Sequence, residues 1–106
     1  MKRTRIKAVL GDTEPGSRVT VAGWVRTRRD SKGGFSFLEI NDGSCLANLQ
    51  VIAPSSLDNY ADDVLRLHPG ASVAVDGTLE ASEGAGQAFE VRAHTVRVLG
   101  FAPPVE

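Results

Sequence analysis

Apolar and polar residues alternate through most of this 106-residue chain, and turn-forming residues interrupt the alternation at short intervals. Such alternation places one set of side chains on the buried face of a β-strand and the other set on its exposed face. In the first segment Val19, Val21 and Val25 share the inward phase, which assigns Arg26 and Arg28 to the outward phase. The pattern recurs in five segments: residues 17–29, 35–41, 45–52, 71–80 and 87–99. The sequence therefore predicts an all-β domain.

The spacing of apolar residues changes between residues 56 and 67, where it becomes three and four. The residues concerned are Leu57, Tyr60, Ala61, Val64, Leu65 and Leu67. A serine pair precedes this segment and Pro69-Gly70 follows it, as expected for the start and end of a helix. Three strands, one helix and two further strands form the five-stranded Greek-key OB barrel, with its helix between the third and fourth strands. That fold binds oligonucleotides or oligosaccharides on its second and third strands.

The length and the residue types favour a single small domain. No apolar run approaches the roughly 20 residues needed to cross a bilayer, and the first residues lack the apolar core of a secretory signal. We therefore expect a soluble, cytoplasmic protein with no membrane partner. The single cysteine, Cys45, excludes an internal disulfide and a cysteine-rich zinc site. We expect a basic arm and lead-in over residues 1–16, the barrel over 17–100, and a linker or hinge beginning at 101–106.

Charge is distributed unevenly along the chain. Residues 1–32 hold nine Lys or Arg against three acids, a balance of +6, whereas residues 33–106 hold three against ten, a balance of −7. This asymmetry indicates that the N-terminal third meets an anion. A basic edge exposed only to solvent is the simpler alternative. The four basic residues among the first seven form either an arm on an RNA backbone or a disordered tail.

Two phenylalanines share the outward phase of the second predicted strand. Leu38 and Ile40 take the inward phase, so Phe35 and Phe37 point toward solvent. Exposed aromatic side chains on a β surface are typical of a platform on which unpaired bases stack. The alternative is that the strand bends and one of the rings covers the end of the barrel.

The neighbouring strands place polar side chains on the same outward phase. On the third strand Gln50 follows this phase, and its amide can both donate to and accept from a base edge. On the fifth strand Glu90 points outward, and a carboxylate in such a site must accept hydrogen bonds from base N–H groups. A solvated amide remains the alternative for Gln50.

A cluster of cations lies at the end of the first predicted strand. Arg26, Arg28, Arg29 and Lys32 occur within seven residues. Arginine can hold a phosphate with two parallel hydrogen bonds or stack on a base. We therefore expect this cluster to contact nucleic acid beside the aromatic platform.

No group of residues indicates catalysis. The two histidines, His68 and His94, have no cysteine or serine in a persuasive nucleophile context, and no glycine-rich phosphate loop precedes a helix. We expect Trp24 and Tyr60 to lie in the core or at its edge. The sequence therefore predicts no catalytic residue, no metal ligand and no cofactor in this chain.

Three motifs carry a resemblance to a known family: GWVRTRRDSKGGFSFLEINDGSC (23–45), SLDNYADDVLRL (56–67) and GQAFEV (86–91). Together they resemble the N-terminal anticodon-binding domain of bacterial asparaginyl-tRNA synthetase. The opening GWV…RRD is shared with the aspartyl and lysyl enzymes of class II. The loop after it, the SLDNY segment and the FEV ending favour the asparaginyl branch.

The resemblance implies roles for four residues. Phe37 matches the aromatic residue that stacks on the middle anticodon uridine, and Gln50 matches the glutamine that contacts the same base. Arg29 matches the arginine before the loop aspartate, and Glu90 matches the glutamate near the first anticodon base. The resemblance also implies tRNA as the partner, a homodimeric parent enzyme, and a catalytic domain outside this chain that binds ATP and magnesium.

Three alternatives remain at this stage. The chain could be the anticodon-binding domain of an aspartyl-type synthetase, or a free-standing OB protein that binds single-stranded nucleic acid. It could also serve as an interaction or dimerisation domain. The sequence that follows Glu106 in the gene would distinguish the domain of a ligase from a free-standing protein.

Overall fold

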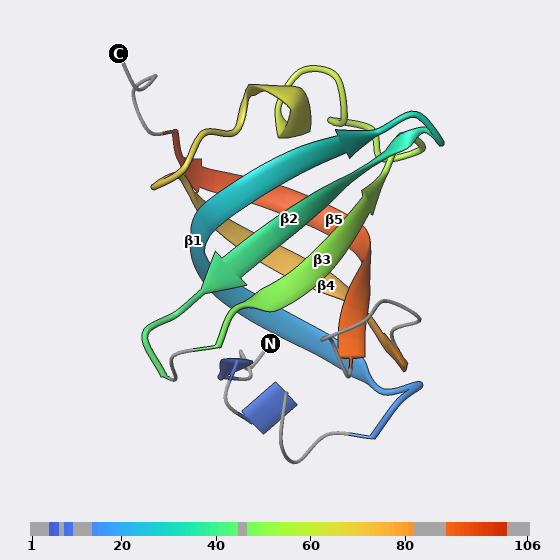
Figure 1. Ribbon diagram of the computed structural model, residues 1–106, viewed down its shortest axis with the longest axis vertical. Coiled ribbons are helices and arrows are strands. Elements are labelled where there is room, and N and C mark those ends of the chain that lie inside the picture. Colours follow the sequence, from blue (N-terminus) through green and yellow to red (C-terminus); the bar gives the residue numbers. More distant parts are fainter. Residues whose placement is uncertain (1–4, 7, 10–13, 45–46, 82–88, 102–106) are drawn as a thin grey trace.

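The computed structural model describes residues 5–6, 8–9, 14–44, 47–81 and 89–101. Its five strands close into a barrel in the order β1-β2-β3-β5-β4 (Figure 1). Neighbouring strands are antiparallel except β3 and β5, which are parallel. The strands are β1 (Arg18–Ser31), β2 (Phe35–Asn41), β3 (Leu49–Pro54), β4 (Ser72–Ala81) and β5 (Phe89–Gly100). The prediction of an all-β, five-stranded OB barrel is confirmed.

The inward phase of the alternation forms the core. Val19, Val21 and Val25 of β1 are buried, as predicted. In β4 buried and partly exposed residues alternate from Ser72 to Glu80 without interruption. Each of the other strands contributes to the same cluster, with Leu38, Ile40, Leu49, Val51, Val91 and Ala93. The core therefore runs through the middle of the barrel, and every strand has one face toward it.

A bulge in β1 changes which arginines point outward. Val25 pairs with Ile40 and Thr27 with Glu39, so Arg26 is an extra residue between the two pairs. Such a bulge shifts the phase of all residues that follow it. Arg28 then pairs with the buried Leu38, and the prediction that Arg26 and Arg28 share one outward phase is wrong. Arg29 takes the outward phase instead.

The predicted helix over residues 56–67 is wrong. The segment consists of successive turns and one short 3₁₀ helix, η1 (Val64–Arg66). The amides of Val64 and Leu65 bond to carbonyls five residues back, on Asn59 and Tyr60, which is not the α-helical pattern. Four Asp and Asn residues lie between positions 58 and 63. Their short polar side chains compete for backbone groups and disfavour a helix.

Side-chain hydrogen bonds hold this turn segment over one end of the barrel. The Asn59 amide donates to the carbonyl oxygen of Val96 in β5 at 2.7 Å. The Arg28 guanidinium donates to the carbonyl oxygen of Val64 at 3.3 Å. The hydroxyls of Tyr60 and the fully buried Ser36 lie 2.7 Å apart. Tyr60 also packs against the core, as predicted.

Two residues ahead of β1 belong to the core. Ile6 and Val9 are fully buried, and the amide of Val9 donates to the carbonyl oxygen of Arg5 at 3.0 Å. The amide of Ile6 donates to a carboxylate oxygen of Asp42 at 3.0 Å. The predicted basic arm over residues 1–16 did not include these two core contacts. The first four residues, with Lys2 and Arg3, lie outside the described residues.

Candidate nucleic-acid interface

Strand register arranges the outward side chains of the barrel in two neighbouring rows. The aromatic row consists of Arg29, Phe37, Ile52, Arg92 and Thr78, each the partner of the next on the adjacent strand. The acidic row consists of Thr27, Glu39, Gln50, Glu90 and Glu80, paired in the same way. Because β3 lies between β2 and β5, Phe37, Gln50 and Glu90 belong to one continuous surface.

Phe37 is half-buried, and its ring contacts both a cation and a second aromatic ring. The guanidinium carbon of Arg29 lies 5.0 Å from the centroid of its ring. The ring of Phe35 meets that of Phe37 edge-on, with centroids 5.0 Å apart and an angle of 83° between the planes. Phe35 therefore supports Phe37 from the side, and the planar guanidinium of Arg29 adds a second surface on which a base can stack.

Ile52 forms the floor between Phe37 and Arg92. It lies on the outward phase of β3, yet it is only 8% exposed. An apolar, covered residue at this position separates the aromatic ring of Phe37 from the cation of Arg92 along the row. Ile52 and Arg92 were not among the predicted site residues, and only the parallel pairing of β3 with β5 shows that Arg92 lies opposite Ile52.

Gln50 is bonded to its neighbour in the acidic row. Its side-chain nitrogen donates to a carboxylate oxygen of Glu90 at 2.8 Å. On the other side of Gln50, Glu39 accepts a hydrogen bond from the Asn48 amide at 3.3 Å. The structure thus brings together the predicted Phe37, Gln50 and Glu90, together with Phe35 and Arg29.

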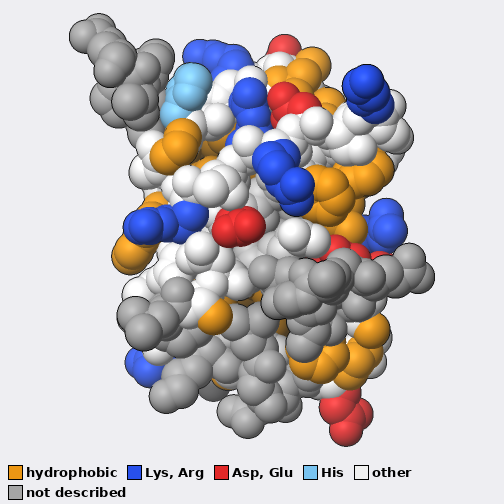
Figure 2. All heavy atoms as spheres, in the orientation of Figure 1, with side chains coloured by type: hydrophobic (Ala, Val, Ile, Leu, Met, Phe, Trp, Pro, Cys, Tyr) orange, Lys and Arg blue, Asp and Glu red, His pale blue; other side chains and the backbone are white. Residues whose placement is uncertain are grey.

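The remaining predicted cations divide into two groups. Arg26 and Lys32 are exposed, on the β1 bulge and in the β1–β2 turn respectively. Arg28 points toward the turn segment and also pairs with Asp30 at 3.4 Å, so it is not part of the platform. Figure 2 shows Lys and Arg side chains interspersed with apolar side chains in the upper part of the face formed by β1, β2 and β3.

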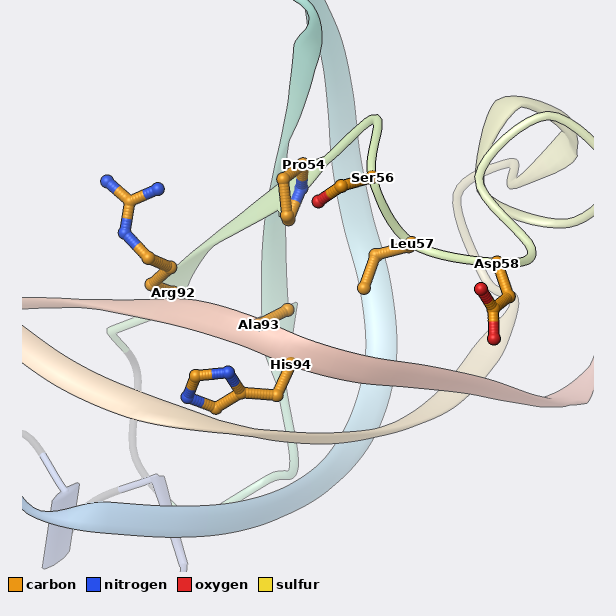
Figure 3. A pocket seen from close by; sticks show the side chains of 7 residues that line it. All are labelled: Pro54, Ser56, Leu57, Asp58, Arg92, Ala93 and His94. Atoms are coloured by element: carbon orange, nitrogen blue, oxygen red, sulfur yellow. The ribbon is translucent and has the colours of Figure 1, made fainter.

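A pocket of about 360 Å³ lies next to the aromatic row (Figure 3). It is lined by Pro54, Ser56, Leu57, Asp58, Arg92, Ala93 and His94. In Figure 3 Arg92 and His94 extend to one side of it, and the carboxylate of Asp58 lies at the opposite end. Its polar groups do not converge on a common point, so the pocket alone does not define a site.

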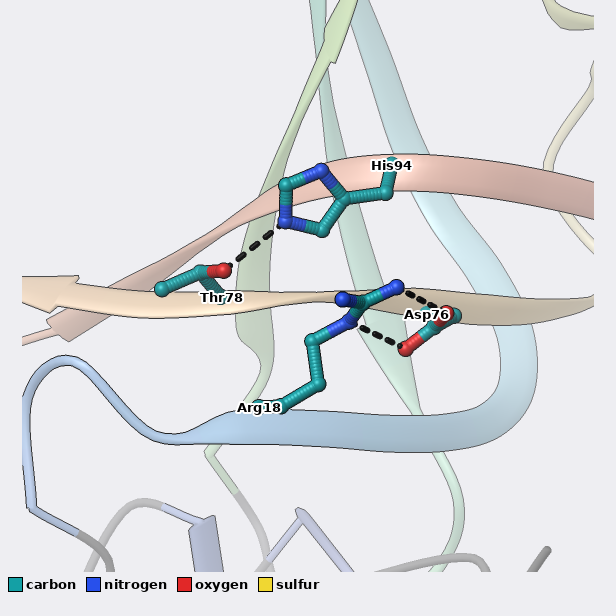
Figure 4. Close-up of polar contacts among 4 residues, drawn as sticks. All are labelled: Arg18, Asp76, Thr78 and His94. Atoms are coloured by element: carbon teal, nitrogen blue, oxygen red, sulfur yellow. Dashed lines mark hydrogen bonds and ion pairs between the residues drawn. The ribbon is translucent and has the colours of Figure 1, made fainter.

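A different set of polar contacts lies on the β1–β4–β5 side of the barrel (Figure 4). The guanidinium of Arg18 donates two hydrogen bonds to Asp76, at 2.9 and 2.7 Å. These bonds and the positive charge of Arg18 lower the pKa of Asp76 from its ordinary value. His94 pairs with Thr78 at 2.8 Å. The Arg18–Asp76 ion pair connects β1 to β4 at an exposed position, as expected for a structural contact.

Two further features of the described part of the chain are relevant to function. It contains no group of three or more His, Cys, Asp or Glu residues that could hold a metal ion. It also contains no helix long and apolar enough to span a membrane.

Trp24, predicted to lie in the core or at its edge, is 42% exposed, and this prediction is wrong.

Comparison with known proteins identifies one family. The chain matches the model of the OB-fold nucleic acid binding domain family over residues 19–99. It is 52% identical over 101 residues to an asparagine–tRNA ligase of Rhodopirellula baltica, covering 95% of this chain and 21% of that protein. It is 55% identical over 95 residues to the corresponding ligase of Myxococcus xanthus, covering 90% of this chain and 20% of that protein. The chain thus spans about a fifth of the length of these relatives.

Solved structures show the same fold. The asparaginyl-tRNA synthetase of Pyrococcus horikoshii, in complex with asparaginyl-adenylate, superimposes with a TM-score of 0.77 and 23% identity, covering 96% of this chain and 23% of that one. An OBody bound to hen egg-white lysozyme superimposes with a TM-score of 0.80 and 24% identity, covering all of this chain and 96% of that one.

Proposed function

The chain belongs to the family of OB-fold nucleic acid binding domains, and we propose that it recognises the anticodon loop of the asparagine tRNA. The proposal is supported by its identity of 52–55% to asparagine–tRNA ligases over 90–95% of its length. In this proposal it is the anticodon-binding domain of such a ligase. In it residues 17–100 form the barrel, residues 1–16 lead into the barrel and contribute Ile6 and Val9 to its core, and residues 101–106 begin the hinge. Adenylation with ATP and magnesium, and homodimer formation, belong to the remainder of the ligase.

The observation that carries the proposal is the register that sets Phe37 diagonally next to Gln50. Phe37 pairs with Ile52, and Gln50 lies two residues before Ile52 on the same strand. Diagonal neighbours on one face of a sheet lie roughly 7–8 Å apart, within reach of a long side chain. A base that stacks on Phe37 therefore presents its hydrogen-bonding edge to Gln50. One aromatic ring and one amide at this spacing suit an unpaired, splayed-out base.

The charged residues around this pair have separate roles in the proposal. Arg29 moves between the ring of Phe37 and a phosphate of the loop, while Arg26 and Lys32 contact the backbone on either side. Phe35 holds Phe37 in position, and Glu90 faces the bases rather than the phosphates. Arg28 holds the turn segment against the barrel instead of touching RNA, as supported by its bond to the Val64 carbonyl.

The direct test is a titration of the chain with three anticodon stem-loops at one fixed salt concentration, since nucleic-acid affinity depends steeply on salt. The loops carry the asparagine anticodon GUU, the aspartate anticodon GUC, and a purine-only anticodon. The proposal requires tightest binding to the GUU loop. Tighter binding to GUC would assign the chain to the aspartyl branch, and equal binding to all three would indicate a non-specific single-strand binder.

A further inference from the structure

The side chains of Gln50 and Glu90 form a hydrogen-bonded pair. We infer that Glu90 is a positioning residue: it fixes the orientation of the Gln50 amide, and this orientation makes the site select uridine over cytidine at the stacked position. The inference rests on the proposed function, because it describes how the same site distinguishes two pyrimidines.

The orientation follows from the chemistry of the contact. A carboxylate only accepts hydrogen bonds, so the group of Gln50 that faces Glu90 must be its NH₂. The nitrogen and the carboxylate oxygen are 2.8 Å apart, which is a short bond to a charged acceptor. The oxygen and nitrogen of an amide diverge from one carbon, so the amide oxygen is turned away from β5. The oxygen is therefore left to accept a hydrogen bond from a base that stacks on the diagonally neighbouring ring of Phe37.

The two pyrimidines respond differently to a fixed amide oxygen. Uracil carries an N–H donor at N3, which can donate to the Gln50 oxygen, while a neighbouring carbonyl of the base accepts from the second N–H of Gln50. Cytosine carries an acceptor at N3, which repels the same oxygen. A freely rotating amide could flip and satisfy either base, because it offers one donor side and one acceptor side. The bond to Glu90 opposes this flip.

The neighbouring charges leave Glu90 available for this role. Arg92, the nearest cation along β5, donates to both carboxylate oxygens of Glu80, at 3.2 and 3.3 Å. Glu39, on the other side of Gln50, accepts from the Asn48 amide. Each of the two flanking acids thus has its own donor, and Glu90 is the acid that holds Gln50.

The first experiment tests, in the absence of RNA, whether Glu90 fixes the orientation of the Gln50 amide. In NMR spectra of the chain, the side-chain NH₂ of Gln50 should show one proton shifted and exchanging slowly. Glu90→Gln keeps the shape of the side chain but provides an NH₂ that can donate to the Gln50 oxygen, so this signature should disappear. Glu80→Gln removes the same charge from the paired position on β4 and should leave it unchanged. Persistence of the signature in Glu90→Gln overturns the inference.

The second experiment measures the preference for uridine over cytidine at the middle anticodon position. In Glu90→Gln this preference should fall about tenfold, the value of one hydrogen bond to a base edge. In Glu80→Gln both affinities should change together and the preference should stay. In a Gln50→Ala background, Glu90→Gln should have no further effect on the preference for uridine, because the two side chains act as one unit.

The remaining outcomes contradict either the inference or the proposed function. An effect of Glu90→Gln that persists in the Gln50→Ala background overturns the inference, as does a change confined to the first anticodon base, which would make Glu90 a direct base contact. In both cases the proposed function stands, because the GUU loop still binds tightly. Failure of the unmodified chain to prefer uridine overturns the inference as well, and failure to bind any stem-loop removes the proposed function itself.

Discussion

Arg29 and Phe37 face each other across the β1–β2 ladder, with the guanidinium carbon 5.0 Å from the ring centroid. A cation over an aromatic face is attracted by the ring quadrupole, by about 0.5–1 kcal/mol at an exposed site. This energy is small enough for a base to replace it. Under the proposed function, we expect binding to exchange this cation–π contact for base stacking on Phe37 and a phosphate contact of Arg29.

Phe37→Ala should weaken binding of the GUU stem-loop by about 1–3 kcal/mol, because stacking of one base on an aromatic ring is worth that amount. Stacking does not depend on base identity, so the GUU loop and a GCU loop should lose affinity equally. Phe101→Ala is the matched control: Phe101 also has an arginine 5.0 Å from its ring, Arg66, but lies beyond the end of β5. Isothermal titration at fixed salt measures all three proteins. Full affinity in Phe37→Ala would place the stacking surface elsewhere.

Arg29 and Arg28 are adjacent in sequence, but their substitution by glutamine should have different effects on binding and on stability. Arg29→Gln should lower the slope of log affinity against log salt by roughly 0.7 if it neutralises one phosphate of a single strand, and should leave stability nearly unchanged. Arg28→Gln should leave the slope unchanged. It should cost about 1 kcal/mol of stability, because Arg28 is largely covered and bonds the carbonyl oxygen of Val64.

Salt titrations from low to physiological ionic strength and urea unfolding separate the two effects. The opposite pattern, with a changed slope in Arg28→Gln and a destabilised Arg29→Gln, would mean that the β1 bulge does not set the directions of these side chains. An unchanged slope in both variants would leave the basic cluster as a solvated edge.

The alternation of residues was sufficient to predict five strands, because a period of two reports directly on which side chains are buried. The same alternation predicted the outward positions of Phe37, Gln50 and Glu90. It could not predict the bond between Gln50 and Glu90, since the parallel pairing of β3 with β5 joins residues forty positions apart. The chain order of strands does not specify which of them become neighbours when a barrel closes.

Two errors of the sequence-based prediction have identifiable structural causes. The bulge at Arg26 carries no glycine or proline, so nothing in the composition marks it, and the phase of Arg28 was wrongly extended from Val25. The helix was predicted from apolar spacing and from the serine pair and Pro69-Gly70 at its two ends. The side-chain amide of Asn59 donates to Asp63, four residues further on, and to the carbonyl oxygen of Val96 in β5. This local bond and this tertiary bond hold successive turns where the spacing favoured a helix.

Tyr60→Phe should lower the free energy of unfolding by about 1 kcal/mol while leaving RNA affinity unchanged. The Tyr60 hydroxyl lies 2.7 Å from that of Ser36, which is fully buried and itself donates to Asp30 at 2.7 Å. Removing one partner of a buried hydroxyl costs roughly the net value of one hydrogen bond. Urea unfolding measures the change. An unaltered midpoint would show that this link between the turn segment and β2 contributes no stability.

Asp42 should make stability depend on pH below the neutral range. Burial alone would raise its pKa, but hydrogen bonds from Ser44 and from the amide of Ile6 outweigh burial and lower the pKa below its ordinary value. A carboxyl whose pKa is lower in the folded state contributes stability at pH values above its unfolded pKa, about 3.9. This contribution is lost as the pH falls from about 4 through the lower folded value.

Asp42→Asn tests this by removing the charge while keeping an oxygen for the Ile6 amide. At pH 7 it should reduce stability by no more than about 1 kcal/mol, because Asp42 is partly exposed and its interactions are screened. Below pH 4 the difference from the unmodified chain should shrink. Hydrogen exchange at pH 7 should be faster at the Ile6 amide, whereas the Val75 amide in β4 serves as the internal control. A difference in stability that stays constant from pH 7 to pH 2 would mean that the anchor of the N-terminal residues depends on shape and not on charge.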